Sequence, residues 1–336
     1  MVEGSQCPDR PRHRPVLLKA VLAALAPQDG GIYVDATFGG GGYSRAILDE
    51  ARARVFAIDR DRQAIAGGQA LAQTFSGRLT LIEGRFSDMS ALLSDHGVER
   101  ADGVVFDVGV SSMQIDDASR GFSFQHDGPL DMRMEASGET AADAVNSLDE
   151  VRLAHIFAAF GEERRARAIA RAIVRKRTER PLARTGELAR LVEGVLGRRP
   201  QDHIHPATRT FQALRIHVNR ELEELAEGLV AAEALLKPGG RLAAVTFHSL
   251  EDRIVKRFLA LRSGKVARPS RHQPMTGEPP EPTFRLLTNG PVGAEPGEIE
   301  NNPRARSAKL RAAVRTSAPP IGAGPSLGAL AGPGSG

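Results

Sequence analysis

Short apolar runs alternate with helical stretches over the first third of the chain. The runs lie at 32–37, 54–59, 79–83 and 103–108, and between them apolar residues recur every three or four positions. This alternation is typical of βαβ units, in which helices cover both faces of a parallel sheet. The pattern predicts four buried parallel strands, the first followed by glycines and the second ending in an acid.

The alternation stops at about residue 131, and the next 75 residues show helical spacing only. Apolar stripes recur at 153–160, 168–173 and 188–195 without a convincing strand between them. Three amphipathic stripes in succession predict a small all-helical domain inserted into the α/β fold.

The α/β pattern then resumes. Apolar residues spaced by three or four positions predict one long helix over 211–236, closed by the Lys-Pro-Gly-Gly of 237–240. A fifth strand follows at 241–247, and 283–288 with 309–315 alternate as an antiparallel pair at the sheet edge. We therefore expect a sheet-containing domain from 15–130 and 207–316 and a helical insert at 131–206. The ends, 1–14 and 317–336, are expected to be disordered.

Composition narrows the class of protein. Hydrophobic residues make up 41% and charged residues 26%, and no apolar run is long enough for a membrane span, which favours a cytoplasmic protein without membrane attachment. The single cysteine, Cys7, excludes a disulfide within the chain and a cysteine zinc site. It also lies outside the expected catalytic fold, which argues against covalent cysteine attack on a pyrimidine. A pI of about 9.5 permits a polyanionic partner.

The strongest local signal is the glycine-rich segment 39–42 between the first strand and the next helix. Glycines there let the backbone approach a ligand closely, although a tight strand–helix turn would use them too. Asp59, at the end of the second strand, suits ribose hydroxyls of either NAD or S-adenosylmethionine. Ser44 stands where a dinucleotide fingerprint has its third glycine, and the Leu-Lys-Pro-Gly-Gly-Arg of 236–241 favours a methyltransferase.

Several longer stretches resemble one family, the bacterial rRNA small-subunit methyltransferase H, or MraW, family. The likeness runs from about residue 13 to 315. The stretches that carry it are 13–18, 39–42, 57–61, 107–117, 120–134, 205–216, 247–253 and 302–311.

The resemblance implies a Rossmann-like class I methyltransferase with a mostly parallel seven-stranded sheet and an inserted all-helical domain. It also implies S-adenosylmethionine as cofactor and N4-methylation of a cytidine in the decoding centre of 16S rRNA, within the small ribosomal subunit. The glycine loop and the resemblance together give the expected cofactor contacts: Gly39, Gly41, Gly42, Tyr43, Asp59, Phe86, Asp107 and Gln114. The family usually has His where this chain has Tyr43, so only a side-chain role is in doubt there.

The chemistry expected at the target amine leaves alternatives open. The N4 lone pair of cytosine is delocalised, so attack on a methyl group needs alignment and an acceptor for the amino group. Asp107, Ser111 and Ser112 are candidate acceptors, but Asp107 is equally suited to holding the cofactor. His248 is either a catalytic group or a structural hydrogen bonder. Glu251 and Asp252 are interpreted as acids that complement a helix dipole.

The helical insert carries most of the expected RNA contacts. A turn around 127–133 is either a simple connection or a lid over a flipped base. Few acids interrupt the arginines that follow, which favours phosphate contacts over a merely solvated face. The expected RNA-binding residues are Arg133, Arg164, Arg165, Arg167, Arg171, Arg175, Lys176 and Arg177. Carboxylate spacing supports no metal site, and a monomer and a homodimer both remain open. The rival hypotheses are a DNA or protein methyltransferase, a non-catalytic RNA-binding assembly factor and, more weakly, a dehydrogenase.

Overall fold

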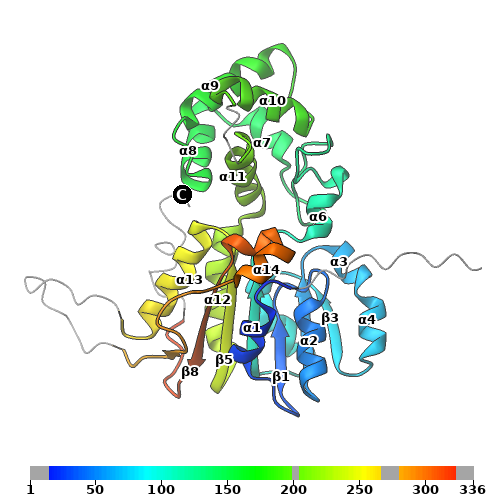
Figure 1. Ribbon diagram of the computed structural model, residues 1–336, viewed down its shortest axis with the longest axis vertical. Coiled ribbons are helices and arrows are strands. Elements are labelled where there is room, and N and C mark those ends of the chain that lie inside the picture. Colours follow the sequence, from blue (N-terminus) through cyan, green and yellow to red (C-terminus); the bar gives the residue numbers. More distant parts are fainter. Residues whose placement is uncertain (1–14, 199–203, 266–279, 323–336) are drawn as a thin grey trace, which may run out of the picture.

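The computed structural model describes residues 15–198, 204–265 and 280–322. Cys7 and the expected disordered segment 1–14 lie outside these residues. Helices surround one sheet in the lower part of the molecule, and a second, helical part stands over the edge at which the parallel strands end (Figure 1). The short helix α6 (Ser112–Asp116) lies where the two parts meet.

The sheet confirms the predicted α/β class. Its strand order is β3-β2-β1-β4-β5-β8-β6, with β7 paired to β8. Strands β1 to β5 are parallel, and β8 is antiparallel to its three neighbours. The sheet has eight strands instead of seven, because the two-residue β7 adds to its edge. The strands are β1 (Ile32–Asp35), β2 (Arg54–Asp59), β3 (Leu79–Glu83), β4 (Ala101–Asp107), β5 (Leu236–Thr246), β6 (Phe284–Leu286), β7 (Val292–Gly293) and β8 (Lys309–Arg315).

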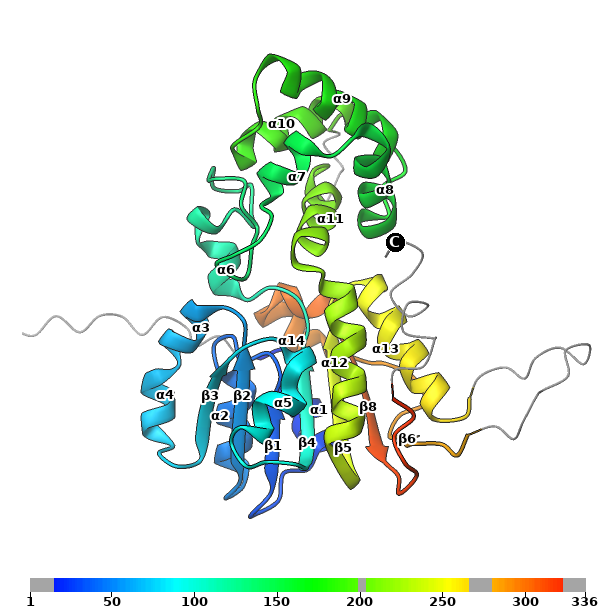
Figure 2. The ribbon, with the colours of Figure 1, turned by 180° about the vertical axis from the view of Figure 1, so that it is seen from behind.

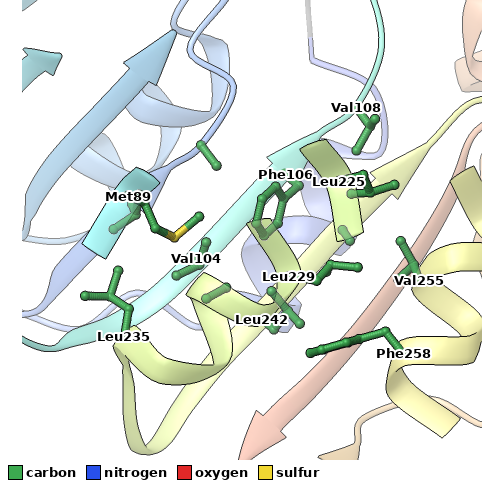
Figure 3. Close-up of a cluster of buried hydrophobic side chains, with 14 of the residues drawn as sticks. Met89, Val104, Phe106, Val108, Leu225, Leu229, Leu235, Leu242, Val255 and Phe258 are labelled. Carbon is green, nitrogen blue, oxygen red and sulfur yellow. The ribbon is translucent and has the colours of Figure 1, made fainter. Parts of the chain in front are cut away.

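Helices cover both faces of this sheet, as the apolar strands require. On one face lie α1 (Leu18–Leu25) and α2 (Gly42–Glu50). On the other lie α5 (Met89–Ser94), α12 (Glu221–Leu235) and α13 (Ser249–Arg262) (Figure 2). Figure 3 shows the core on this second face of the sheet, in which Phe106 of β4, Leu229 of α12 and Phe258 of α13 belong to one apolar cluster. The remaining helices of this part are α3 (Arg62–Gly67), α4 (Gln69–Thr74) and α14 (Pro296–Asn301).

Two predicted helices are each broken into two. The stretch 63–75 forms α3 and α4 with Gly68 between them, where a Cβ would lie 2.4 Å from the Phe38 ring. The stretch 211–236 divides at Arg220, whose left-handed φ of 48° ends α11 (Thr208–Asn219) and begins α12. The apolar spacing continues across Arg220 because both halves bury one face, although they bury it in different cores.

The upper part consists of helices and includes the described residues of the stretch 131–206 that was expected to form the insert. It contains α7 (Ala141–Ser147), α8 (Glu150–Gly161), α9 (Ala166–Glu179) and α10 (Thr185–Leu196), and α11 packs against α8. The three predicted stripes supply its core, and no described residue of 131–198 belongs to a strand. Its apolar cluster begins at Phe122 and ends at Leu214, so it extends beyond both ends of the range 131–206.

The C-terminal segment is ordered further than expected. Ala318 is buried, and the carbonyl of Gly322 accepts a hydrogen bond of 2.8 Å from Arg262. Residues 317–322 thus do not fit the disorder expected for 317–336, and the remainder of that range lies outside the described residues. Within the described ranges, no helix has the length and apolar character needed to cross a membrane.

Candidate active site at the carboxyl edge of the sheet

The glycine loop packs closely against its surroundings. Gly41 precedes α2 with a φ of 74°, and a Cβ there would lie 2.6 Å from Leu71. A Cβ on Gly42 would lie 2.2 Å from Pro15 Cγ, whereas one on Gly40 would meet nothing within 4 Å. The loop thus needs glycine for conformation at one position and for space at the next.

Asp35, at the end of β1, binds the first turn of the helix that follows this loop. Its carboxylate is fully buried and accepts hydrogen bonds from the Ser44 backbone at 3.1 Å and the Ser44 hydroxyl at 2.7 Å. Burial raises its pKa to about 6. Asp35 therefore holds the first turn of α2 against the sheet, a role that sequence reasoning did not assign to it.

Asp59, at the end of β2, ties the glycine loop to the next strand. One carboxylate oxygen accepts from the Gly39 N–H and the other from the Asp61 N–H, each at 2.8 Å. Burial raises the pKa of Asp59. Each carboxylate oxygen can accept a second hydrogen bond, so this geometry is compatible with ribose hydroxyl donors.

Asp61 joins three elements around the same edge. Its carboxylate accepts from Gln114 Nε2 of α6 and from Arg120, both at 2.8 Å, and from the Gln63 N–H at 3.0 Å. The Arg120 guanidinium also donates to the backbone carbonyls of Arg133 and Met134. Asp61 and Arg120 were both missed from the sequence, although each belongs to a stretch that carries the family resemblance.

Asp107, at the end of β4, has the most perturbed environment of the predicted acids. Its backbone N–H donates to Thr37 at 2.7 Å, but its buried Oδ1 has no hydrogen-bond partner among the described residues. Burial, reinforced by the negative charges of Asp35 and Glu251, raises its pKa to about 8. An unpartnered buried carboxylate oxygen of this kind is a candidate contact for a polar or charged ligand.

The two predicted serines after β4 have protein partners. Ser111 caps α6 by accepting from the Gln114 N–H, and the Gln114 side-chain oxygen accepts from the Ser111 N–H. The Ser112 hydroxyl accepts a hydrogen bond from Arg304, which also pairs with Asp116 at 3.7 Å. The C-terminal segment around Arg304 is thereby fastened to the loop that follows β4.

His248 and Glu251 form one unit at the start of α13. His248 Nδ1 accepts from the Glu251 N–H, and Glu251 Oε2 accepts from the N–H groups of Phe247 and His248. The second oxygen, Oε1, lies 2.9 Å from His248 Nε2 without hydrogen-bond alignment, and neither atom has another partner among the described residues. Burial alone would raise the pKa of Glu251, but the His248 side chain and the positive Arg215 outweigh it and lower that pKa.

The dipole interpretation of Glu251 and Asp252 is therefore incomplete. Glu251 is fully buried and fixes a turn, and Asp252 is bonded to Arg311 at 2.7 Å and to Lys309 at 3.4 Å. Both acids are in the first turn of α13, as predicted, but they have specific partners.

Glu221 lies beside this unit, and with His248 and Glu251 it has the residue types of a metal site. The observed bonding does not suit a metal ion. Both Glu221 oxygens are bound to Arg215 at 2.8 Å, and His248 Nδ1 accepts a hydrogen bond, which keeps the imidazole proton on Nε2. We interpret the cluster as a buried charge network.

Two expected cofactor residues use their side chains for packing. The Tyr43 ring is buried and its hydroxyl donates to the Val16 carbonyl, so a ligand contact would come from its backbone. The Phe86 ring packs edge-on against Phe106 with ring centres 5.3 Å apart, and lies against Gly228 of α12. The Tyr43 side chain, which stands where the family usually has His, is thus engaged in packing.

The basic residues of the insert fall into two groups. Arg133 is bonded to Asp131 at 2.8 Å, and Arg177 donates to the carbonyls of Val145 and Leu148, so both are built into the fold. The others are exposed; Arg171 pairs with Glu150 at 3.4 Å and Lys176 with Glu179 at 2.8 Å. The exposed members are Arg164, Arg165, Arg167, Arg171, Arg175 and Lys176.

Comparisons with known proteins match most of the chain. Residues 10–316 match the model of the MraW methylase family. The "Ribosomal RNA small subunit methyltransferase H" of Parvibaculum lavamentivorans is 61% identical over 309 residues, covering 92% of this chain and 91% of the relative. The protein of the same name from Xanthobacter autotrophicus is 58% identical and covers 96% of this chain and 92% of the relative. A solved rRNA methylase from Streptococcus thermophilus is 12% identical, with a TM-score of 0.40 over 93% of this chain and 99% of that one.

Proposed function

This chain belongs to the MraW methylase family, and on that basis we propose that it transfers a methyl group from S-adenosylmethionine to N4 of a cytidine in the decoding centre of 16S rRNA. That it is a methyltransferase follows from the family; the cofactor, the RNA and the atom are the proposal. The observation that carries it is the unpartnered, buried Oδ1 of Asp107 beside the glycine loop.

The residues at the carboxyl edge fit the proposed cofactor. The loop of Gly39, Gly41 and Gly42 is held by close packing and by the bond from the Gly39 N–H to Asp59, and Asp59 also offers acceptors for ribose hydroxyls. When bound, S-adenosylmethionine supplies an electrophilic methyl group on a positively charged sulfur. A cationic ligand suits a site in which Asp35, Asp107 and Glu251 bring three carboxyl groups together.

The chain's own contribution to the transfer is alignment and acceptance of a hydrogen bond. Asp107 Oδ1 can accept a hydrogen bond from the exocyclic amino group and hold its lone pair toward the methyl group. Ser111 and Gln114 fix the first turn after β4, and Asp61 fixes Gln114. No cysteine is required, since the amino nitrogen itself is the nucleophile.

In this proposal the sheet-containing part, 15–130 and 207–316, holds the cofactor, and the insert at 131–206 recognises the RNA. The support for RNA binding is a stripe on α9, where Arg167, Arg171 and Arg175 are exposed and spaced by four residues. Residues at this spacing lie on one helix face, and guanidinium groups pair well with phosphates. The substrate then places the reaction in the cytoplasm.

A transfer assay with parallel acceptors tests the proposal. The protein and labelled S-adenosylmethionine are incubated with small subunits from cells that lack this protein, with naked 16S rRNA, with DNA and with total protein. We expect label in the small-subunit RNA. Transfer only to DNA or protein, or cofactor binding without transfer to any acceptor, would overturn the assignment.

A further inference from the structure

Three of the five unpartnered buried polar atoms among the described residues belong to Asp107, His248 and Glu251. They lie where β4 and β5 end side by side, since Asp107 is paired with Val245 in the sheet register. Satisfied polar groups are the rule inside proteins, so a group of unsatisfied ones marks a place with a functional demand.

Glu251 occupies the centre of this group. Its side chain is 0% exposed, and Oε2 accepts the two N–H groups that begin the β5–α13 turn. A Cβ on Gly109 would lie 3.9 Å from Oε1, so the turn that follows Asp107 passes directly beside this carboxylate. Glu251 is therefore hydrogen-bonded to the turn after β5 and lies beside the turn after β4.

Glu251 and Asp107 differ in the charged groups that surround them. Glu251 faces His248 in its own turn, Arg215 from α11, Glu221 from α12 and Asp107 from β4. Arg215 is engaged by both oxygens of Glu221, so it only partly offsets the charge of Glu251. Asp107 faces Asp35 from β1, Tyr43 from α2 and Glu251 from α13. Among the described residues, the groups whose charge is coupled to that of Asp107 are these two acids and one phenol, and none of the three is positive.

We propose that Glu251 is a positioning residue for methyl transfer, which holds His248 and the β5–α13 turn beside Asp107 and whose negative charge acts on the Asp107 carboxyl group. The proposal rests on the proposed function, because it assigns Asp107 to the reacting end of the site. In the free protein the charge of Glu251 favours protonated Asp107; a cationic ligand then favours its ionisation, so binding releases a proton.

The test uses two substitutions and one matched control. Glu251→Gln keeps the shape and removes the charge; Glu251→Asp keeps the charge and shortens the reach to His248. Asp252→Asn alters the next acid of the same turn, which is bonded to Arg311 and Lys309 of β8. For each variant, kcat and KM toward S-adenosylmethionine are measured from about pH 5.5 to about pH 9.5 with small subunits as the acceptor. The pH profile of kcat/KM reports the protein without bound cofactor, and the range brackets the pKa of its Asp107.

We expect Glu251→Gln to move the midpoint of the pH profile to lower pH by about one pH unit, the displacement given by a tenfold change in proton affinity. Glu251→Asp should keep the midpoint and lower kcat about tenfold with little change in KM, as loss of alignment in the transition state would. Asp252→Asn should keep both the midpoint and kcat. An unmoved midpoint in folded Glu251→Gln, or a wild-type kcat in Glu251→Asp, would overturn the proposal.

A second measurement separates this inference from the proposed function. Calorimetric titration of S-adenosylmethionine at about pH 7.5, in buffers of different ionisation enthalpy, reports proton release without any RNA. The wild type should release most of one proton for each S-adenosylmethionine bound, and Glu251→Gln should release only a minor fraction of one proton. Equal proton release would contradict the role of Glu251 even if methyl transfer were normal. If proton release follows these expectations but no methyl group is transferred to RNA, only the proposed function is contradicted.

Discussion

Replacing Asp61 by Asn should lower both the free energy of unfolding and the affinity for the cofactor. Asp61 is 4% exposed, and its carboxylate receives three hydrogen bonds, two of them from Gln114 and Arg120 at 2.8 Å. The amide nitrogen that Asp61→Asn introduces would face at least one of these donors. Gln114 cannot simply turn over to compensate, because its oxygen accepts from Ser111.

The magnitude follows from the burial of the partners. A hydrogen bond to a charged group contributes about 1.5–3 kcal/mol, and removal of one partner of a buried ion pair costs about 3–5 kcal/mol. The Arg120 side chain is 14% exposed, so water can restore part of its hydration. We therefore expect a loss of about 3 kcal/mol in the free energy of unfolding. The affinity for S-adenosylmethionine should fall about tenfold, as Gln114 becomes less well held.

A urea titration and a cofactor-binding titration measure the two effects. The matched control is Asp117→Asn, a half-buried helix cap that accepts a hydrogen bond from the Ser119 N–H, where Asn serves equally well as the cap. A double-mutant cycle with Arg120→Met isolates the ion pair and should give a coupling energy of at least about 1.5 kcal/mol. Additivity within about 0.5 kcal/mol, or an equal loss in Asp117→Asn, would refute the reasoning.

Three further predictions concern the loop, the acid and the basic face. Gly42→Ala should abolish detectable cofactor binding in a titration, while Gly40→Ala, with open space around it, should bind as the wild type does; equal affinities would contradict the close packing. Because the pKa of Asp107 is about 8 in the folded protein and near 3.8 unfolded, the wild type loses stability as pH rises between these two values. The Asp107→Asn variant has no carboxyl group to ionise, so its thermal midpoint minus that of the wild type should increase as pH rises from about 3.8 to about 8 and should stay constant above about pH 8. The same difference in thermal midpoint at every pH would contradict this prediction. Arg167→Gln with Arg175→Gln should weaken binding to small subunits and lower the slope of log affinity against log salt by about 1.5, without changing cofactor affinity; an unchanged slope would exclude phosphate contacts there.

The sequence was most informative for elements that depend on residues close together in the chain and on a regular apolar spacing. The buried strands, the acids at their ends and the glycine loop all follow from apolar period and spacing within a few residues. The break at Arg220 could not be predicted, because the apolar spacing runs on through it and only tertiary packing decides that α11 and α12 separate. The same limit applies to the order of residues 317–322, where Arg262 binds the Gly322 carbonyl.

The site was harder to predict where partners are distant in sequence. Asp61 and Arg120 are 59 residues apart, and the residues adjacent to each in the sequence do not indicate an ion pair. Glu251 has the position of an ordinary first-turn acid, and only the fold shows that it is fully buried beside the turn after Asp107. Conversely, Arg177 belongs to a basic run but is used to bind backbone carbonyls, which the run could not reveal.

The most direct test of the central claim is to identify the modified nucleoside. Small subunits from cells lacking this protein are methylated with labelled S-adenosylmethionine, the RNA is digested, and the labelled nucleoside is identified by mass spectrometry against standards. The account predicts that the label is in N4-methylcytidine from 16S rRNA. Label in 5-methylcytidine, in another base or in ribosomal protein would contradict it.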